Sequence, residues 1–358
     1  MTMRSIGIML AAGAMLAAAP AQARNDDGIA PQRARNIILF LGDAGGVPTL
    51  SAAGIMAHDR PQSLFIQSMP HVGLSDTSAL DNWVTDSAAG MSAIMTGHKT
   101  NSGMISALPA ADGAITPVKS FLEYAEQRGL STGVVTNMPI WDATPAACFA
   151  HVATRKDKDQ IFRQMLTPRF GNGVDILIGK GQADAVASFA KDGTTPQAAF
   201  ARAGYRFGDD PALVKDSGRA AVLRDADYAP IPAVEWDMHT DKPENGLKHV
   251  IEMDEMIRRV SAIAGKETLI LFTADHSFGL RMTSGKRNAP MARQYAAAAV
   301  KPGATVASNA IIGVEDSHTG EEVIAAAAGP GADQVHGFFA NTRLFDVMLK
   351  AMGWTKED

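Results

Sequence analysis

The sequence predicts an α/β protein with a doubly wound, mainly parallel sheet and helices on both of its faces. Short, continuous apolar runs that end at a glycine or an acid are typical of strands buried on both faces. Helical patterns lie between these runs, and alternating strands and helices favour a parallel sheet covered on both sides. The predicted strands are residues 36–42, 132–136, 174–178, 268–274 and 322–327.

The clearest predicted helix covers Leu247 to Ile263. It repeats apolar residues at three- and four-residue spacing, which is the period of an amphipathic helix. The positions expected to face the core are Val250, Met253, Ile257 and Val260, and those expected to face solvent are Glu252, Asp254, Arg258 and Arg259. A second helix of small residues is expected over Ala88–Met95, with Ser87 at its N-cap. Residues 180–232 and 282–309 have weak periodicity, and we interpret them as small loop excursions from the core fold.

The chain has 358 residues, 46% of them hydrophobic, which is typical of a globular protein with a sizeable core. Its net charge of -5 offers no basic stripe for a nucleic-acid backbone, so nucleic acid is not expected as a partner. Cys148 is its single cysteine, which excludes an internal disulfide. A core or bound metal must therefore stabilise the fold.

The first 23 residues have the pattern of a secretory signal peptide. Arg4 precedes an uncharged run from Ile6 to Ala19, and small residues at Ala21 and Ala23 suit cleavage near Ala23. The run is shorter than the ~20 apolar residues that span a bilayer, so we expect no stable membrane insertion after cleavage. The predicted organisation is a signal peptide (1–23), a polar segment (24–35) and a single domain (36–358), in a periplasmic or secreted protein.

Ser87 is the first candidate for chemistry. A serine hydroxyl is a weak nucleophile at neutral pH and needs a neighbouring base or a metal ion to activate it. No Gly-x-Ser-x-Gly elbow surrounds Ser87, which argues against an acyl-transfer triad. At a helix N-terminus, the backbone N–H groups would also attract a phosphate. The alternative is that Ser87 only caps its helix.

Acids and histidines at predicted strand ends favour the metal alternative. Asp43 follows the first strand, and Asp275 and His276 follow the run 268–274, so all three are expected at one edge of the sheet, where such folds bind ligands. The other candidates are Asp142, Thr144, Glu235, Asp237, His239 and His318. Mixed Asp and His ligands suit zinc, whereas carboxylate and hydroxyl ligands suit magnesium. Gly45 and Gly46 are interpreted as a tight turn that lets the backbone approach this site.

These residues belong to segments that resemble the signatures of the alkaline phosphatase family, in the family's order and over nearly the whole mature chain. The matching segments are 36–46, 84–101, 142–155, 273–277 and 318–332. The resemblance implies an alkaline-phosphatase-like catalytic domain that hydrolyses phosphate monoesters with two zinc ions and one magnesium ion. It also leaves a homodimer possible.

The resemblance further implies a role for each site residue. Ser87 would attack phosphorus and become a phosphoserine, and Arg155 would hold two phosphate oxygens with its planar fork. Asp43, Asp275 and His276 would bind the zinc beside Ser87. Asp142 and Thr144 would bind magnesium together with Asp43, and His318 would belong to the other zinc, which stabilises the leaving oxygen.

The stretch around Glu235 departs from the family pattern because it is several residues shorter. In one arrangement Glu235 takes the place of the family's zinc aspartate. In the other, which we favour, Glu235 binds magnesium while Asp237 and His239 bind zinc.

A phosphodiesterase and a non-catalytic phosphate-binding protein are also compatible with parts of the pattern, whereas a sulfatase is not. A phosphodiesterase of the same superfamily commonly carries threonine at the nucleophile position, so Ser87 together with Arg155 favours monoesters. A sulfatase needs x-Pro-x-Arg after the nucleophile, and the residues after Ser87 do not supply it. A non-catalytic phosphate-binding protein would trap phosphate stoichiometrically without turnover.

Overall fold

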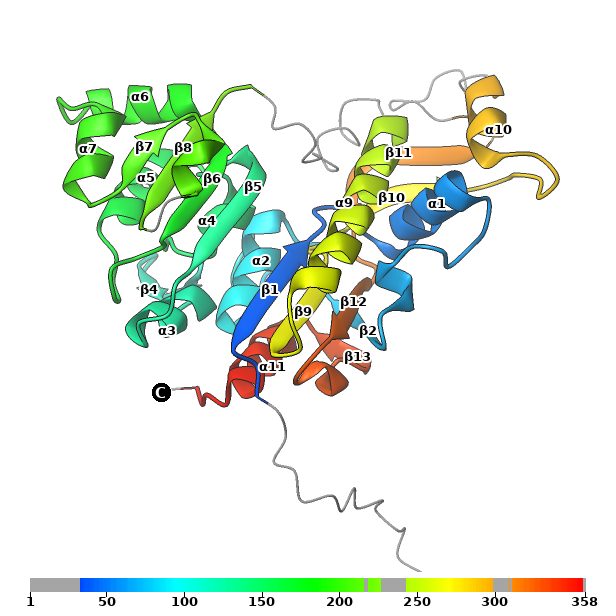
Figure 1. Cartoon of the computed structure of the whole chain (residues 1–358), viewed down its shortest axis with the longest axis horizontal. Coiled ribbons are helices and arrows are strands. Elements are labelled where there is room, and N and C mark those ends of the chain that lie inside the picture. Colours follow the sequence, from blue (N-terminus) through cyan, green and yellow to red (C-terminus); the bar gives the residue numbers. More distant parts are fainter. Residues whose placement is uncertain (1–32, 216–217, 227–242, 299–308, 310, 357–358) are drawn as a thin grey trace, which may run out of the picture. The chain divides into compact units, whose positions relative to one another are not determined.

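The strands form two larger sheets in the computed structural model, which describes residues 33–215, 218–226, 243–298, 309 and 311–356 (Figure 1). The five-stranded sheet has the order β1 (Asn36–Leu41), β9 (Thr268–Thr273), β12 (Val323–Ala328), β2 (His71–Asp76) and β13 (Gly337–Ala340). The four-stranded sheet has the order β5 (Gly133–Pro139), β6 (Ile176–Lys180), β8 (Ala220–Arg224) and β7 (Arg206–Gly208). Two strand pairs complete the described sheets: β10 (Ser277–Met282) with β11 (Ile312–Thr319), and β3 (Ala107–Pro109) with β4 (Ile115–Pro117).

The α/β class with a mainly parallel sheet is confirmed. All pairs of the four-stranded sheet are parallel, as are β1 with β9 and β2 with β13. β12 runs antiparallel to both of its neighbours. All five predicted strands are present within three residues of the expected bounds.

Helices cover the five-stranded sheet on both faces because its central strands are apolar on both sides. Leu269 and Leu271 of β9 pack with α2 (Ser87–Thr96) and α11 (Thr342–Met352). The alternating residues Ile270 and Phe272 pack with α1 (Val47–His58) and α9 (Pro243–Ile263) on the other face. The other helices that the structure describes are α3 (Phe121–Gln127), α4 (Ala143–Ala146), α5 (Lys158–Leu166), α6 (Gln182–Ala190), α7 (Pro196–Arg202) and α10 (Met291–Ala297), with short 3₁₀ turns at Ile66–Ser68, Pro211–Val214 and Ala332–Gln334.

The region 180–232 is more regular than its weak periodicity predicted. Its described part contains α6, α7, β7 and β8, so it supplies half the strands of the four-stranded sheet. Its helices are short, and aromatic packing of Phe189 and Phe200 joins them to the core. Tertiary contacts therefore stabilise these helices and strands, which the spacing of apolar residues in the sequence does not predict.

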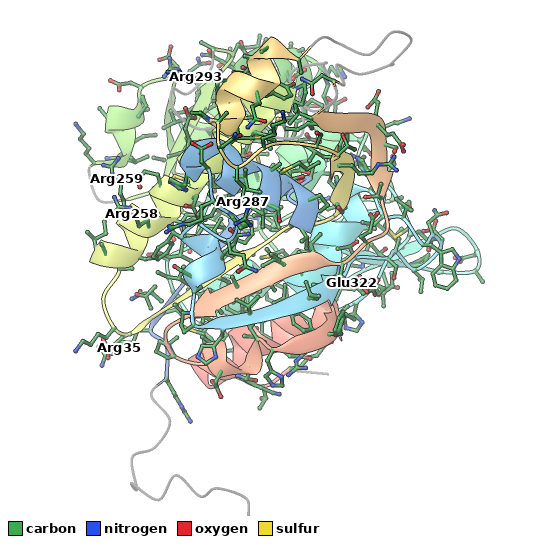
Figure 2. All side chains as sticks on the ribbon, turned by 90° about the vertical axis from the view of Figure 1, so that its right-hand side faces the viewer. Arg35, Arg258, Arg259, Arg287, Arg293 and Glu322 are labelled. Atoms are coloured by element: carbon green, nitrogen blue, oxygen red, sulfur yellow. The ribbon has the colours of Figure 1, made fainter. Side chains whose placement is uncertain are left out.

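The predicted amphipathic helix is confirmed as α9, with one correction. Arg258 and Arg259 are exposed, as Figure 2 shows, but Asp254 is buried. Its two carboxylate oxygens accept hydrogen bonds from the backbone N–H groups of Phe65 and Ile66, each at 2.8 Å. Asp254 thus joins α9 to the 3₁₀ turn at Ile66–Ser68. No helix in the described part of the chain is both long and apolar enough to cross a membrane.

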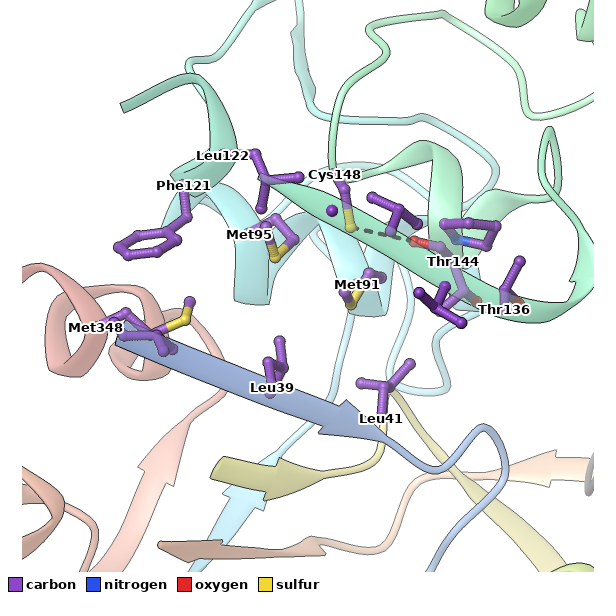
Figure 3. Close-up of a pocket in the computed structure, with 15 residues that line it drawn as sticks. Leu39, Leu41, Met91, Met95, Phe121, Leu122, Thr136, Thr144, Cys148 and Met348 are labelled. Atoms are coloured by element: carbon purple, nitrogen blue, oxygen red, sulfur yellow. Dashed lines mark hydrogen bonds between the residues drawn. The ribbon is translucent and has the colours of Figure 1, made fainter. Parts of the chain in front are cut away.

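A cavity of about 220 Å³ separates β1 from β5, the facing edge strands of the two larger sheets. Figure 3 shows Leu39 and Leu41 pointing into it from β1, with Thr144 and Cys148 at its other side. Burial raises the pKa of the Cys148 thiol to about 12, so the thiol stays protonated and weakly reactive. Thr144 lies between this cavity and the site described next.

Candidate active site

The acids and the histidine at the two strand ends meet as predicted. β1 and β9 are parallel neighbours, with Leu41 opposite Thr273, so the residues that follow them lie side by side. One potential ligand atom from each of Asp43, Asp275 and His276 lies within 4.8 Å of the others. His276 Nε2 is 3.2 Å from Asp43 Oδ1 and 3.7 Å from Asp275 Oδ2. Asp275 and His276 are fully buried.

The turn after β1 brings Asp43 to this position, and the predicted role of its glycines is confirmed. The Gly45 N–H donates to the Gly42 carbonyl at 2.8 Å, which closes the turn. A Cβ atom on Gly46 would lie only 2.1 Å from Ser277 Oγ. The turn therefore packs directly against the strand that follows His276, and a side chain at residue 46 would push the two apart.

The expected helix after residue 86 is present as α2, but Ser87 is not its cap. Asp86 is the N-cap residue, and its Oδ1 accepts the Ala89 N–H at 3.1 Å. Ser87 is therefore the first helical residue, and its hydroxyl is not engaged as a cap. Ser87 Oγ lies 3.3 Å from His276 Nε2 and is buried. Ser87 therefore contacts the cluster of Asp43, Asp275 and His276 through His276.

Hydrogen bonding prepares the cluster for a cation. His276 Nδ1 lies 3.0 Å from the Ser277 carbonyl, so Nδ1 carries the proton and Nε2 presents its lone pair. Asp275 Oδ2 is buried and has no hydrogen-bond partner among the described residues. Two carboxylates, one with an unsatisfied buried oxygen, beside an imidazole lone pair are a donor set that fits zinc.

His318 lies against this cluster. Its ring stacks on that of His276, with ring centroids 3.7 Å apart. His318 Nδ1 is 3.0 Å from the Thr85 carbonyl, just before Asp86 and Ser87. β11, which carries His318, pairs with β10 and places Phe278 opposite His318. The structure therefore brings His318 to the predicted site.

Two carboxylates hold Arg155 beside the start of α2. Its Nη1 donates to Asp86 Oδ2 at 3.2 Å and its Nη2 donates to Asp142 Oδ1 at 2.9 Å. Burial by itself lowers the pKa of the guanidinium, but the charges of Asp142 and then Asp86 outweigh burial and raise the pKa above its ordinary value. Arg155 therefore stays charged. The sequence analysis did not predict that Asp86 holds Arg155. The position of Asp86 directly before Ser87 was the signal that could have indicated it.

The structure gives the two predicted magnesium ligands, Thr144 and Asp142, different surroundings. Thr144 Oγ1 donates to Asp43 Oδ2 at 3.3 Å, so Thr144 adjoins the cluster. Asp142 Oδ1 instead accepts from Arg155 and from the Ala143 N–H, and Asp142 is not among the clustered ligand residues. Its observed function is to hold Arg155, and its magnesium role stays a prediction. The remaining predicted ligands, Glu235, Asp237 and His239, lie outside the described residues.

Comparison with known proteins agrees with this geometry. A family model described as "Alkaline phosphatase" matches residues 34–216. The chain belongs to the alkaline phosphatase family, whose members are phosphoric monoester hydrolases. It is 25% identical to alkaline phosphatase 4 of Bacillus subtilis, covering 89% of this chain and 88% of that protein. It is 27% identical to the streptomycin-6-phosphate phosphatase of Streptomyces griseus, covering 95% of each.

A solved structure shares the fold. The alkaline phosphatase of Thermus thermophilus has a TM-score of 0.75 and 22% sequence identity, covering 91% of this chain and 93% of that one. The family match, not this shared fold, confirms the predicted class of enzyme, a phosphomonoesterase.

Proposed function

We propose that this enzyme is exported and metal-dependent, and that it hydrolyses phosphate monoesters through a transient phosphoserine on Ser87. One observation carries the proposal: Ser87 Oγ, His276 Nε2 and the Asp43 carboxylate lie in one buried contact chain, with successive distances of 3.3 and 3.2 Å. Export rests on the pattern of residues 1–23, which lie outside the described residues. N-terminal sequencing of the protein recovered from the periplasm or medium tests it, and an uncleaved Met1 would contradict it.

The side-chain types of the proposed ligands suit zinc and magnesium. Asp43, Asp275 and His276 would hold one zinc ion, and His318 with Asp237 and His239 would hold the second. Thr144, Asp43 and Glu235 would hold magnesium, with Asp142 as a further predicted ligand. When bound, these cations supply positive charge that stabilises the deprotonated serine oxygen and the departing alcohol oxygen.

The protein's own groups account for binding and attack. Arg155, held at both η nitrogens by Asp86 and Asp142, presents its remaining N–H groups to two phosphate oxygens. Ser87 Oγ forms a bond to phosphorus as the ester P–O bond breaks, and the alcohol leaves with a proton. Water then cleaves the Ser87 phosphoester, releasing inorganic phosphate and restoring the hydroxyl. The positive end of the α2 dipole, at Ser87, stabilises the added negative charge.

The test is Ser87→Ala, compared with Ser68→Ala, an exposed serine on the Ile66–Ser68 turn. We expect Ser87→Ala to lower kcat for a monoester at least ~10³-fold, with unchanged zinc and magnesium content by elemental analysis. Ser68→Ala should retain activity and metals. A Ser87→Ala enzyme with near-parental kcat would remove Ser87 from the reaction.

Paired monoester and diester substrates test the alternative. Each ester of a pair carries the same leaving group, so only the second substituent on phosphorus differs. We expect the parent enzyme to prefer the monoester because the Arg155 fork recognises two unsubstituted oxygens. Faster hydrolysis of the diester would favour the phosphodiesterase alternative. Binding of inorganic phosphate with no hydrolysis of either ester would favour a phosphate-binding protein.

A further inference from the structure

Three large apolar side chains are exposed on one short loop beside the active site. Leu80, Trp83 and Val84 are 56%, 89% and 42% exposed. We call residues 80–84 the 80–84 loop. The other large exposed apolar residues of the described chain are scattered through the sequence, so this loop is where they concentrate. A grouped apolar surface next to a catalytic site is typical of a recognition surface.

Hydrogen bonds hold the 80–84 loop in place. The Leu80 N–H donates to the Thr100 carbonyl at 2.8 Å, and the Ser102 N–H donates to Asp81 Oδ1 at 2.9 Å. Asn82 Nδ2 donates to Ser102 Oγ at 3.0 Å. A rigid loop presents an aromatic ring with little conformational entropy left to lose when a ligand binds.

On one side, the loop is continuous with the groups that bind phosphate. Residues 100–102, which hold the loop, lead directly to Gly103. The Gly103 N–H donates to Asp86 Oδ1 at 3.0 Å, and its carbonyl accepts the Arg155 N–H at 2.7 Å. Arg155 is the proposed phosphate fork, and Asp86 is one of the two carboxylates that hold it.

On the other side, the loop adjoins the strand of His318. A Cβ atom on Gly320 would lie 3.4 Å from the Trp83 carbonyl and 3.5 Å from Val84 Cγ2. Thr85, which follows the loop, accepts from His318 at its carbonyl. The 80–84 loop therefore lies between the Arg155 fork and His318, directly before the nucleophile helix.

We propose that Trp83, with Leu80 and Val84, binds the alcohol half of the substrate and gives the enzyme a preference for apolar and aromatic phosphate monoesters. This inference rests on the proposed function. Ser87 is almost fully buried, whereas the loop is exposed, so an ester whose phosphate lies on Ser87 and Arg155 must extend its alcohol half outward past the rim of the site. An apolar alcohol that covers the Trp83 ring removes apolar surface of both partners from water.

The experiment compares 1-naphthyl phosphate with glycerol 1-phosphate in the parent enzyme, Trp83→Ala, Trp83→Phe and Phe338→Ala. The quantity is the ratio of kcat/KM for the aryl ester to that for the polar ester. We expect Trp83→Ala to lower this ratio about tenfold, mainly through a higher KM for the aryl ester, and Trp83→Phe to restore most of it. Phe338, which is also exposed but lies on edge strand β13 and not on the 80–84 loop, is the matched control, and its variant should keep the parental ratio.

Three other outcomes would contradict the inference, and they distinguish a wrong role for the loop from a wrong function for the enzyme. A parental ratio in Trp83→Ala, in an enzyme active on both esters, removes the loop from substrate recognition while leaving the proposed function intact. A parental ratio together with loss of a dimer in sedimentation would assign the loop to an interface between copies instead. If the parent hydrolyses neither ester, the proposed function fails and the loop assignment falls with it.

Discussion

Replacing Asp275 by asparagine should stabilise the metal-free protein and destabilise the zinc-loaded protein. The carboxylates of Asp43 and Asp275 lie within 4.8 Å of each other through their ligand oxygens. At that separation, and with an effective dielectric constant of about 20, two negative charges repel by about 3.5 kcal/mol. His276 between them and entering water reduce this value. We therefore expect Asp275→Asn to gain about 1–3 kcal/mol of unfolding free energy without metal.

With zinc bound, the parent protein should have a higher free energy of unfolding than Asp275→Asn. Ligand at a thousand times its dissociation constant stabilises a folded protein by about 4 kcal/mol. Asparagine offers a neutral oxygen in place of the charged one, so the variant should gain much less from zinc. Urea unfolding with EDTA and with excess zinc measures both differences.

Asp254→Asn is the matched control for this experiment. Asp254 is also a buried carboxylate, but its oxygens accept backbone N–H groups instead of facing another acid. Its substitution should destabilise the protein by about 1–2 kcal/mol whether or not zinc is present. If Asp275→Asn behaves like Asp254→Asn in both conditions, Asp275 is a structural acid and the cluster is not a metal site.

Three further changes test other parts of the site and fold. Arg155→Lys should weaken inhibition by inorganic phosphate about 10- to 100-fold with unchanged metal content, because a lysine cannot form the bidentate fork; an unchanged Ki would contradict the fork. Gly46→Ala should cost about 1–3 kcal/mol in urea unfolding, because its Cβ would lie 2.1 Å from Ser277 Oγ; parental stability would mean that the turn moves freely. Burial raises the pKa of Glu126 to about 7, despite a hydrogen bond from Thr132. The folded state therefore keeps a proton that the unfolded state releases, and stability should fall as the pH rises from about 4.5 to about 7. Glu126→Gln should lose that part of the pH dependence, and an unchanged slope would contradict it.

The sequence was most informative where strands are fully buried. The runs that became β1 and β9 are apolar on both faces, and residues directly after parallel neighbours must meet at one sheet edge. The sequence alone therefore predicts that three residues lie together: Asp43, Asp275 and His276. The parallel sheet and its covering helices follow from the same alternation of strands and helices.

The sequence was less informative where one residue can have two roles. Asp86 and Ser87 are both good N-cap residues, and only the helix register shows that Asp86 is the cap. Asp254 lies at a polar position of an amphipathic pattern, yet its partners come from a turn 188 residues away in the sequence. Asp142 carries a charge suited to a metal or to arginine, and the sequence alone does not show that the fold brings the Arg155 guanidinium to it.

The most direct test of the central claim is peptide mapping of the enzyme quenched in acid during turnover of a phosphate monoester. We expect the peptide that contains Ser87 to carry one added phosphoryl group, which disappears when substrate is exhausted. Continued turnover with that peptide always unmodified would contradict nucleophilic attack by Ser87.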